Sequence, residues 1–182
     1  CTQKVGTLIT NEDGRAGYYL DPGTYWAKET GDEHGRFEDE YWMVDETIHK
    51  FEIKPHEDVS ITFTNVQYGR LKITKTVEGG GSVEGWQFKI TDAEGTVLDG
   101  SPFATDEDGI ILTGNLLPGK YTVEEILPEN SFYQCVNENP QTVIVKQGEI
   151  AGVSFTNALR SGKITVDKID TTGEHLAGAT FL

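Results

Sequence analysis

A lysine, a glutamate and an asparagine lie on the apolar faces of three expected strands in this sequence. Side chains alternate between the two faces of a strand. In residues 71–75 the face with two apolar side chains also carries Lys75. By the same count, Glu125 and Asn157 each share a face with the apolar residues that precede them in their runs. We therefore expect three polar groups at the inner edge of three strands.

These three residue types have a joint chemistry when they are buried together. Burial lowers the pKa of a lysine, which then acts as a neutral amine nucleophile, and it raises the pKa of a carboxyl group, which then holds a proton. Such a carboxyl group can polarise an asparagine amide and relay the proton to the departing ammonia. The product is a Lys–Asn isopeptide bond. Because a finished fold holds both reactants in place, the reaction is a single self-modification and not the turnover of an enzyme.

The chain of 182 residues contains an internal repeat. Residues 10–14 recur at 105–109, residues 20–25 at 116–121, and residues 61–65 at 153–157. The repeating unit is roughly 93 residues long, which is a normal size for one β-sandwich domain. The first copy repeats the glutamate and the asparagine as Glu29 and Asn65, but no strand with a lysine precedes them.

Alternation of apolar and polar residues predicts an all-β chain. The runs lie at 71–75, 86–91, 121–125, 142–146 and 153–157, and Gly, Pro, Asn or Asp residues separate them. The two Asp-Gly tetrads and the two Pro-Gly pairs have the residue types of tight turns. Because the tetrads lack the spacing of an EF-hand loop, we expect no calcium site there.

Residues 161–182 begin a third copy of the repeat. Gly178 and Phe181 align with Gly85 and Phe88, and placing Leu182 directly before the N-terminal residue keeps the repeat in phase. This segment thus carries the strand that the first copy lacks, with Lys168 at the position of the missing lysine. It completes the first copy of its own molecule, or that of a neighbour, which we favour. The alternative is a piece of a longer array with an unpaired tail.

Composition excludes several function classes. The formal net charge is −15, so nucleic acid would be repelled. The apolar stretches are too short for a membrane-spanning helix, and we expect neither a membrane span nor a signal peptide. The histidines have no metal-ligand spacing, so we expect no metal or cofactor. They are His34, His49, His56 and His175. Cys1 and Cys135 are too few for a disulfide framework and are expected to be free, buried thiols.

Three motif groups together resemble the Cna-B type, prealbumin-like domains of Gram-positive surface adhesins and pilins. They are Gly162-Lys-Ile-Thr-Val-Asp-Lys-Ile-Asp170 followed by Leu176-Ala-Gly-Ala-Thr-Phe181, Pro118-Gly-Lys-Tyr-Thr-Val-Glu-Glu125, and Phe155-Thr-Asn157. The resemblance implies tandem β-sandwiches with Lys75–Asn157 and Lys168–Asn65 cross-links, catalysed by Glu125 and Glu29. The expected domains are 1–67, which lacks its first strand, 68–160, which is complete, and 161–182.

The resemblance implies a structural stalk or shaft segment on the wall of a Gram-positive cell. Its expected partners are neighbouring copies of the chain or adjacent stalk domains. A competing hypothesis is a module that binds a host matrix protein or a glycan through the aromatic-rich loop 31–45, which includes Tyr41 and Trp42. The alternative for these two aromatic residues is local packing under that loop.

Overall fold

The computed structural model describes residues 4–31 and 41–182, and in these ranges the regular elements are all β-strands. The expectation of an all-β chain is confirmed. No helix in the described ranges has the length and hydropathy that crossing a membrane requires. The strands are β1 (Gly23–Ala27), β2 (Trp42–Met43), β3 (His49–Ile53), β4 (Val66–Gln67), β5 (Arg70–Val77), β6 (Gln87–Thr91), β7 (Phe103–Ala104), β8 (Ile110–Leu112), β9 (Gly119–Ile126), β10 (Tyr133–Cys135), β11 (Gln141–Val145) and β12 (Ile150–Leu159).

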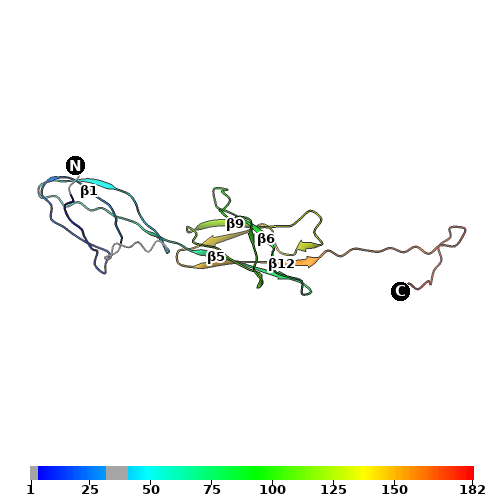
Figure 1. Ribbon diagram of the computed structural model, residues 1–182. Coiled ribbons are helices and arrows are strands. Elements are labelled where there is room, and N and C mark those ends of the chain that lie inside the picture. The colour runs from blue at the N-terminus through cyan, green and yellow to red at the C-terminus, as the bar shows by residue number, and fades with distance from the viewer. Residues whose placement is uncertain (1–3, 32–40) are drawn as a thin grey trace.

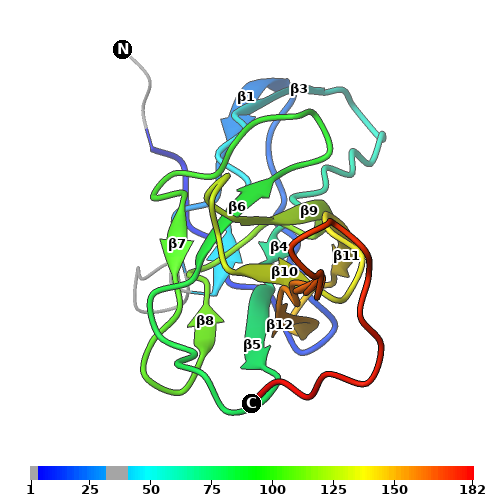
Figure 2. The same ribbon diagram turned by 90° about the vertical axis from the view of Figure 1, so that its right-hand side faces the viewer.

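Strands β5 to β12 form a sandwich of two four-stranded sheets. One sheet has the order β10-β12-β5-β8 and the other has the order β11-β9-β6-β7. The five alternating runs expected from the sequence lie in β5, β6, β9, β11 and β12. Figure 2 shows these strands in a view along the length of the molecule. The inward side chains of the five runs supply most of the core between the sheets. The buried apolar residues are Leu71, Ile73, Phe88, Ile90, Ile111, Leu116, Tyr121, Val123, Val145 and Phe155.

The first strand of the sandwich, β5, pairs in parallel with the last strand, β12. The register pairs Ile150 with Arg70 and Asn157 with Val77. All other strand pairs in the sandwich are antiparallel. This one parallel pair brings together two segments that are about 80 residues apart in the sequence. Closing such a long loop lowers the conformational entropy of the chain and therefore opposes the pairing.

Residues 4–67 repeat part of this arrangement. Strand β1 pairs with β3 in the way that β9 pairs with β11, with Tyr25 opposite Phe51 and Tyr121 opposite Val143. The hydroxyl of Tyr25 donates to the carbonyl oxygen of Asp21 at 2.8 Å. The hydroxyl of Tyr121 makes the same contact, also at 2.8 Å, with the residue four positions before it.

The first copy has no buried core in its described residues. Every described residue between 4 and 67 is exposed or only partly buried, whereas the sandwich holds ten buried apolar residues. Residues 61–65, the repeat counterpart of 153–157, lie outside any strand, and β4 begins at Val66. A strand requires a hydrogen-bonded neighbour, and no described strand lies beside residues 61–65 as β5 lies beside β12.

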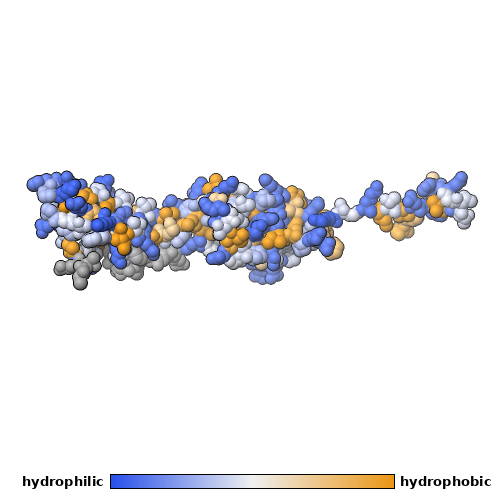
Figure 3. All heavy atoms as spheres, turned by 90° about the horizontal axis from the view of Figure 1, so that it is seen from above, coloured by the Kyte–Doolittle hydropathy of each residue, from blue (hydrophilic) through white to orange (hydrophobic). Residues whose placement is uncertain are grey.

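The molecule is elongated (Figure 1). The first copy lies at one end, the sandwich lies in the middle, and residues 160–182 extend from the opposite end of the sandwich. The parallel pairing explains this shape, because β5 and β12 both run away from the first copy. Figure 3 shows apolar side chains along this C-terminal segment, apart from the body of the protein.

Candidate functional site

Lys75, Glu125 and Asn157 meet inside the sandwich. The Nζ atom of Lys75 lies 3.2 Å from Oε1 of Glu125. The amide Nδ2 of Asn157 donates a hydrogen bond of 2.9 Å to the same oxygen. The exposed fractions of the three residues are 1%, 3% and 0%. One carboxylate oxygen therefore joins the amine and the amide nitrogen in a site without access to bulk water.

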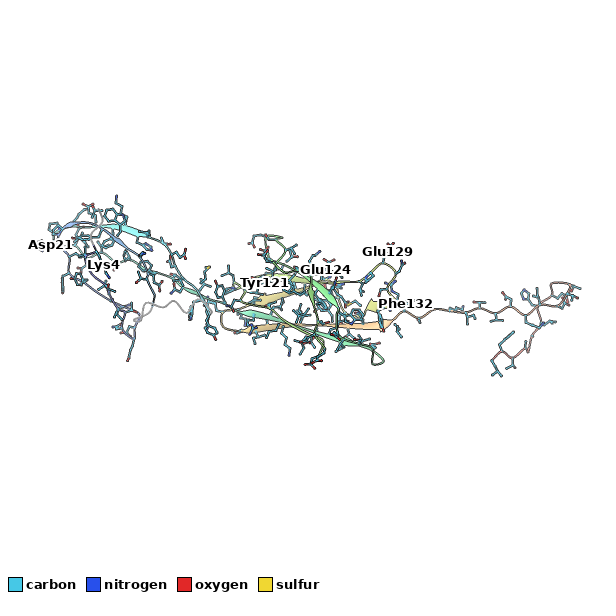
Figure 4. All side chains as sticks on the ribbon, viewed as in Figure 1. Lys4, Asp21, Tyr121, Glu124, Glu129 and Phe132 are labelled. Carbon is cyan, nitrogen blue, oxygen red and sulfur yellow. The ribbon has the colours of Figure 1, made fainter. Side chains whose placement is uncertain are left out.

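Strand parity places each of these groups. Lys75 is in β5, Glu125 in β9 and Asn157 in β12, and each occupies a buried position of an alternating pattern. The neighbouring Glu124 has the opposite parity and pairs with Lys89 on the outer face of β9. Figure 4 labels Glu124 and Tyr121 on this strand. The sequence therefore correctly separates the inward glutamate from the outward one.

The lysine amine is held in an apolar and aromatic environment. It lies 4.3 Å from the centroid of the Trp86 ring and donates a hydrogen bond of 3.1 Å to the carbonyl oxygen of Thr76. Burial lowers the pKa of Lys75, and the negative charge of Glu125 opposes this effect. The surroundings therefore favour the neutral amine that a nucleophile needs.

Two polar atoms at the site have no hydrogen-bond partner. They are Oε2 of Glu125 and Oδ1 of Asn157, both buried. Unpartnered buried polar atoms are rare and costly. A carboxyl group that carries a proton can donate a hydrogen bond to the carbonyl oxygen of an amide. At this site the donation requires the side-chain amide of Asn157 to flip by half a turn. Oε2 of Glu125 and Oδ1 of Asn157 therefore remain available for such a hydrogen bond.

Two further residues border the site, and the sequence pattern did not identify either of them as a site residue. Trp86 shares strand parity with the buried Phe88 and Ile90, so its inward position was open to detection by counting. Cys135 lies directly opposite Asn157 in the pairing of β10 with β12. It is a free thiol, as expected, but it is only partly buried and not buried as the sequence predicted. Burial raises the pKa of Cys135, and the charge of Glu125 raises it further.

The first copy contains the same glutamate–asparagine pair. The amide Nδ2 of Asn65 donates a hydrogen bond of 2.9 Å to Oε1 of Glu29. The backbone N–H of Asp45 donates to Oδ1 of Asn65, also at 2.9 Å. Oε2 of Glu29 is buried and has no partner. The structure brings these two expected site residues together, and in the part of the chain that it describes no lysine contacts them.

Lys168, the lysine expected to serve this pair, lies in the exposed C-terminal segment. Its Nζ atom donates a hydrogen bond of 3.1 Å to the carbonyl oxygen of Ile169. Lys75 makes the same contact with the residue that follows it, at the same distance. Lys168 therefore has the local geometry of Lys75 without its glutamate and asparagine.

The other expectations concern metals and the aromatic loop. The described residues contain no group of three or more His, Cys, Asp or Glu side chains that could hold a metal ion. In the tetrad at 105–109, the Asp106 carboxylate accepts hydrogen bonds from the backbone N–H groups of Asp108 and Ile110, as in a tight turn.

Cys1, His34 and most of loop 31–45 lie outside the described residues. Tyr41 is exposed and Trp42 is partly buried.

Solved structures with a similar fold were found at low sequence identity. The minor pilin GBS52 of Streptococcus agalactiae is 20% identical, with 87% of this chain and 70% of that chain covered and a TM-score of 0.48. The Bacillus anthracis TIE protein is 17% identical, with 96% of this chain and 39% of that chain covered and a TM-score of 0.45. The shaft pilin SpaA of Lactobacillus rhamnosus GG is 15% identical, with 87% of this chain and 71% of that chain covered and a TM-score of 0.41. Such identities concern the fold alone.

A family model gives the assignment. No curated protein matches the chain. The model described as SpaA, prealbumin-like fold domain, matches residues 69–159. The matched range contains β5 to β12 and therefore Lys75, Glu125 and Asn157. Because this range is half of the 182 residues, the chain belongs to the SpaA family of prealbumin-like fold domains.

Proposed function

We propose that this chain is a structural segment of a surface adhesin or pilus of a Gram-positive bacterium, and that its sandwich cross-links itself through an amide bond between Lys75 and Asn157. The observation that carries the proposal is the shared oxygen: the amine and the amide nitrogen both contact Oε1 of Glu125. Glu125 is thus positioned to receive a proton from the nucleophile and deliver it to the leaving group.

The proposed reaction balances without a cofactor. The neutral Nζ atom of Lys75 attacks the side-chain carbonyl carbon of Asn157, and a new C–N bond forms. The bond from that carbon to Nδ2 breaks, and Glu125 relays the proton from the amine to Nδ2, so that ammonia leaves. The buried site supplies proximity, which replaces a bimolecular encounter. Each domain performs the reaction once, and no external substrate is involved.

The position of the bond suits a protein that carries tension. Strands β5 and β12 are the first and last strands of the domain that we propose for residues 68–160, with residues 1–67 and 161–182 as its neighbours. A pulling force applied at the two ends of this domain acts on these two adjacent strands. An amide between them transmits the force through covalent bonds and leaves the hydrogen bonds of the sheets unloaded.

The remaining features agree with a solvated shaft outside the cell. The net charge of −15 keeps such a surface soluble and disfavours unspecific contacts. Two of the solved structures with this fold are pilins by name, and we propose the same setting for this chain. The proposed partners are further copies of the chain or adjacent shaft domains, joined head to tail by addition of a strand.

Intact mass under denaturing and reducing conditions tests the Lys75–Asn157 bond. We expect the monomeric fraction of the wild-type chain to lack the mass of one ammonia, and a proteolytic digest to yield one branched peptide that joins Lys75 to Asn157. Glu125→Gln should restore the full mass. Glu124→Gln is the matched control, because it changes the adjacent outward glutamate and should keep the bond. A full mass for the wild-type chain would refute the proposed reaction.

A further inference from the structure

The loop between β10 and β11, residues 136–140, connects the two sheets of the sandwich. Strand β10 pairs with β12 in one sheet, and β11 pairs with β9 in the other (Figure 2). Asn157 belongs to β12 and Glu125 belongs to β9. The loop therefore begins next to the strand of the reacting amide and ends next to the strand of the proposed catalyst.

Asn139 in this loop binds the backbone of Glu125 at both of its polar groups. The N–H of Glu125 donates a hydrogen bond of 2.9 Å to Oδ1 of Asn139. In return, Nδ2 of Asn139 donates a hydrogen bond of 3.0 Å to the carbonyl oxygen of Glu125. A side-chain amide has one acceptor oxygen and a donor nitrogen, as a backbone peptide group does. One side chain thus replaces both partners that a neighbouring strand would offer to Glu125.

The register of β11 explains why a side chain takes this place. The first residue of β11, Gln141, pairs with Val123 of β9. Continued by two residues, this antiparallel register places Asn139 opposite Glu125. The residue between, Pro140, has no N–H group and therefore cannot extend the backbone ladder. The amide of Asn139 continues the pairing of β9 beyond the end of β11.

Asn137 makes a similar replacement beside the reacting asparagine. The N–H of Thr156 donates a hydrogen bond to Oδ1 of Asn137. The carbonyl oxygen of Thr156 accepts a hydrogen bond of 2.8 Å from the N–H of Val136. This carbonyl is part of the peptide group that leads into Asn157. The loop therefore fixes the backbone on the N-terminal side of the reacting residue.

The proposed site depends on such fixing because its three groups come from two sheets. Lys75 and Asn157 lie on paired strands of one sheet, so their spacing is set within that sheet. Oε1 of Glu125 comes from the other sheet and lies 3.2 Å from the amine and 2.9 Å from the amide nitrogen. Misplacement of a reacting group by about 1 Å can slow a reaction about 100-fold. The rate therefore depends on how exactly the two sheets are held at this point.

We infer that loop 136–140 positions the amide-forming site, with Asn139 as the positioning residue for Glu125 and Asn137 as the positioning residue for Asn157. The inference rests on the amide chemistry proposed for Lys75. Both asparagines act through the backbone, since their hydrogen bonds go to N–H and carbonyl groups of Glu125 and Thr156. They set the geometry of the reaction and take no part in the bond-forming step.

Rates of ammonia loss in the folded, full-length chain test this inference. Each variant is isolated in urea before it folds and is then diluted into buffer at pH 7. Circular dichroism follows folding, and intact mass follows ammonia loss. We expect Asn139→Ala and Asn137→Ala each to slow ammonia loss after folding by about tenfold or more relative to the wild-type chain. Both positions are exposed, so neither substitution opens a cavity in the core.

Gln141→Ala is the matched control. Nε2 of Gln141 donates a hydrogen bond of 2.8 Å to the carbonyl oxygen of Ser154. The substitution removes a side-chain contact between the same two sheets but leaves the backbones of Glu125 and Thr156 bound. We expect the wild-type rate. Denaturant titrations of the three alanine variants in a Glu125→Gln background, where the bond does not form, measure stability separately. A role limited to closing the loop would lower that stability and leave the rate unchanged.

Aspartate substitutions provide a second test that keeps the shape of each side chain. Asn137→Asp retains the oxygen that accepts the N–H of Thr156 and should retain most of the wild-type rate. Asn139→Asp retains the acceptor for the N–H of Glu125 but loses the donor to its carbonyl oxygen, so it should retain only part of the rate. Equal rates for the two aspartate variants would contradict the inference even if an alanine variant fails to fold.

The outcomes separate this inference from the proposed function. If the wild-type chain loses ammonia and both alanine variants lose it equally fast, the positioning role is wrong and the Lys75–Asn157 bond stands. If Gln141→Ala is slowed as much as the asparagine variants, the assignment to Asn137 and Asn139 is also wrong. A wild-type chain that keeps its full mass refutes both the bond and the positioning role.

Discussion

Lys75 and Asn157 lie on adjacent parallel strands and are offset by two residues, with Lys75 opposite Phe155 and Asn157 opposite Val77. The offset keeps both side chains on the inner face, because residues two apart share a face of a strand. Glu125 reaches both from the opposite sheet. The first strand of the sandwich, its last strand and one buried carboxyl group of the other sheet thus meet at a single point.

The proposed bond should raise the stability of the sandwich substantially. It closes a loop of about 80 residues, for which the chain-entropy model gives about 4–5 kcal/mol. We expect Glu125→Gln to lower the free energy of unfolding by at least about 4 kcal/mol in guanidinium titrations. Glu124→Gln breaks only a half-exposed ion pair with Lys89 and should change stability by less than about 1 kcal/mol. Equal effects of the two substitutions would contradict the cross-link.

Removal of the asparagine should reveal the titration of Lys75. Asn157→Ala leaves a free amine whose pKa burial lowers from 10.5. Between the folded pKa and 10.5, the unfolded chain binds more protons than the folded chain, so stability rises with pH in this window and is lower and constant below it. We expect urea midpoints of Asn157→Ala to rise from pH 7 toward pH 10, relative to the double variant Lys75→Met, Asn157→Ala. Parallel curves for the two variants would disprove the shift.

The indole of Trp86 should control the rate of bond formation. It covers the amine of Lys75 at 4.3 Å. Trp86→Ala admits water and moves the pKa of Lys75 toward its ordinary value, so we expect ammonia loss in freshly refolded protein to slow at least several-fold at pH 7. Trp86→Phe should retain most of the rate. Trp26→Ala is the matched control, because Trp26 lies 5.7 Å from Lys50 on an exposed strand. Time-resolved intact mass provides the measurement, and equal rates for both alanine variants would exclude this role.

The thiol of Cys135 should report the charge of Glu125. Burial and the Glu125 carboxylate both raise its pKa. Glu125→Gln removes the charge at nearly constant volume, so we expect the midpoint of the pH profile for alkylation of Cys135 to shift to lower pH. Peptide mapping separates Cys135 from Cys1. Glu124→Gln should leave the midpoint unchanged. A midpoint that does not move in Glu125→Gln would place the charge too far from the thiol to matter.

Features that depend on nearest neighbours along the chain were predictable from residue types and their spacing. Alternation assigned Lys75, Glu125 and Asn157 to inner faces and Glu124 to an outer face, because strand geometry fixes the parity of every side chain. The turn residues and the repeat followed from local residue types in the same way. The contact between Tyr121 and Leu117 recurs in Tyr25 and Asp21 because both atoms lie within one short turn.

Which distant groups meet depends on long-range strand pairing and sheet packing, which no local pattern encodes. The parallel pairing of β5 with β12 sets the offset between Lys75 and Asn157, and packing of the second sheet places one oxygen of Glu125 between them. Cys135 borders the site through a register that no local pattern encodes. Residues 61–65 have the same alternation as 153–157 and yet form no strand, because a strand is stabilised by hydrogen bonds to a neighbour and no described strand pairs with them.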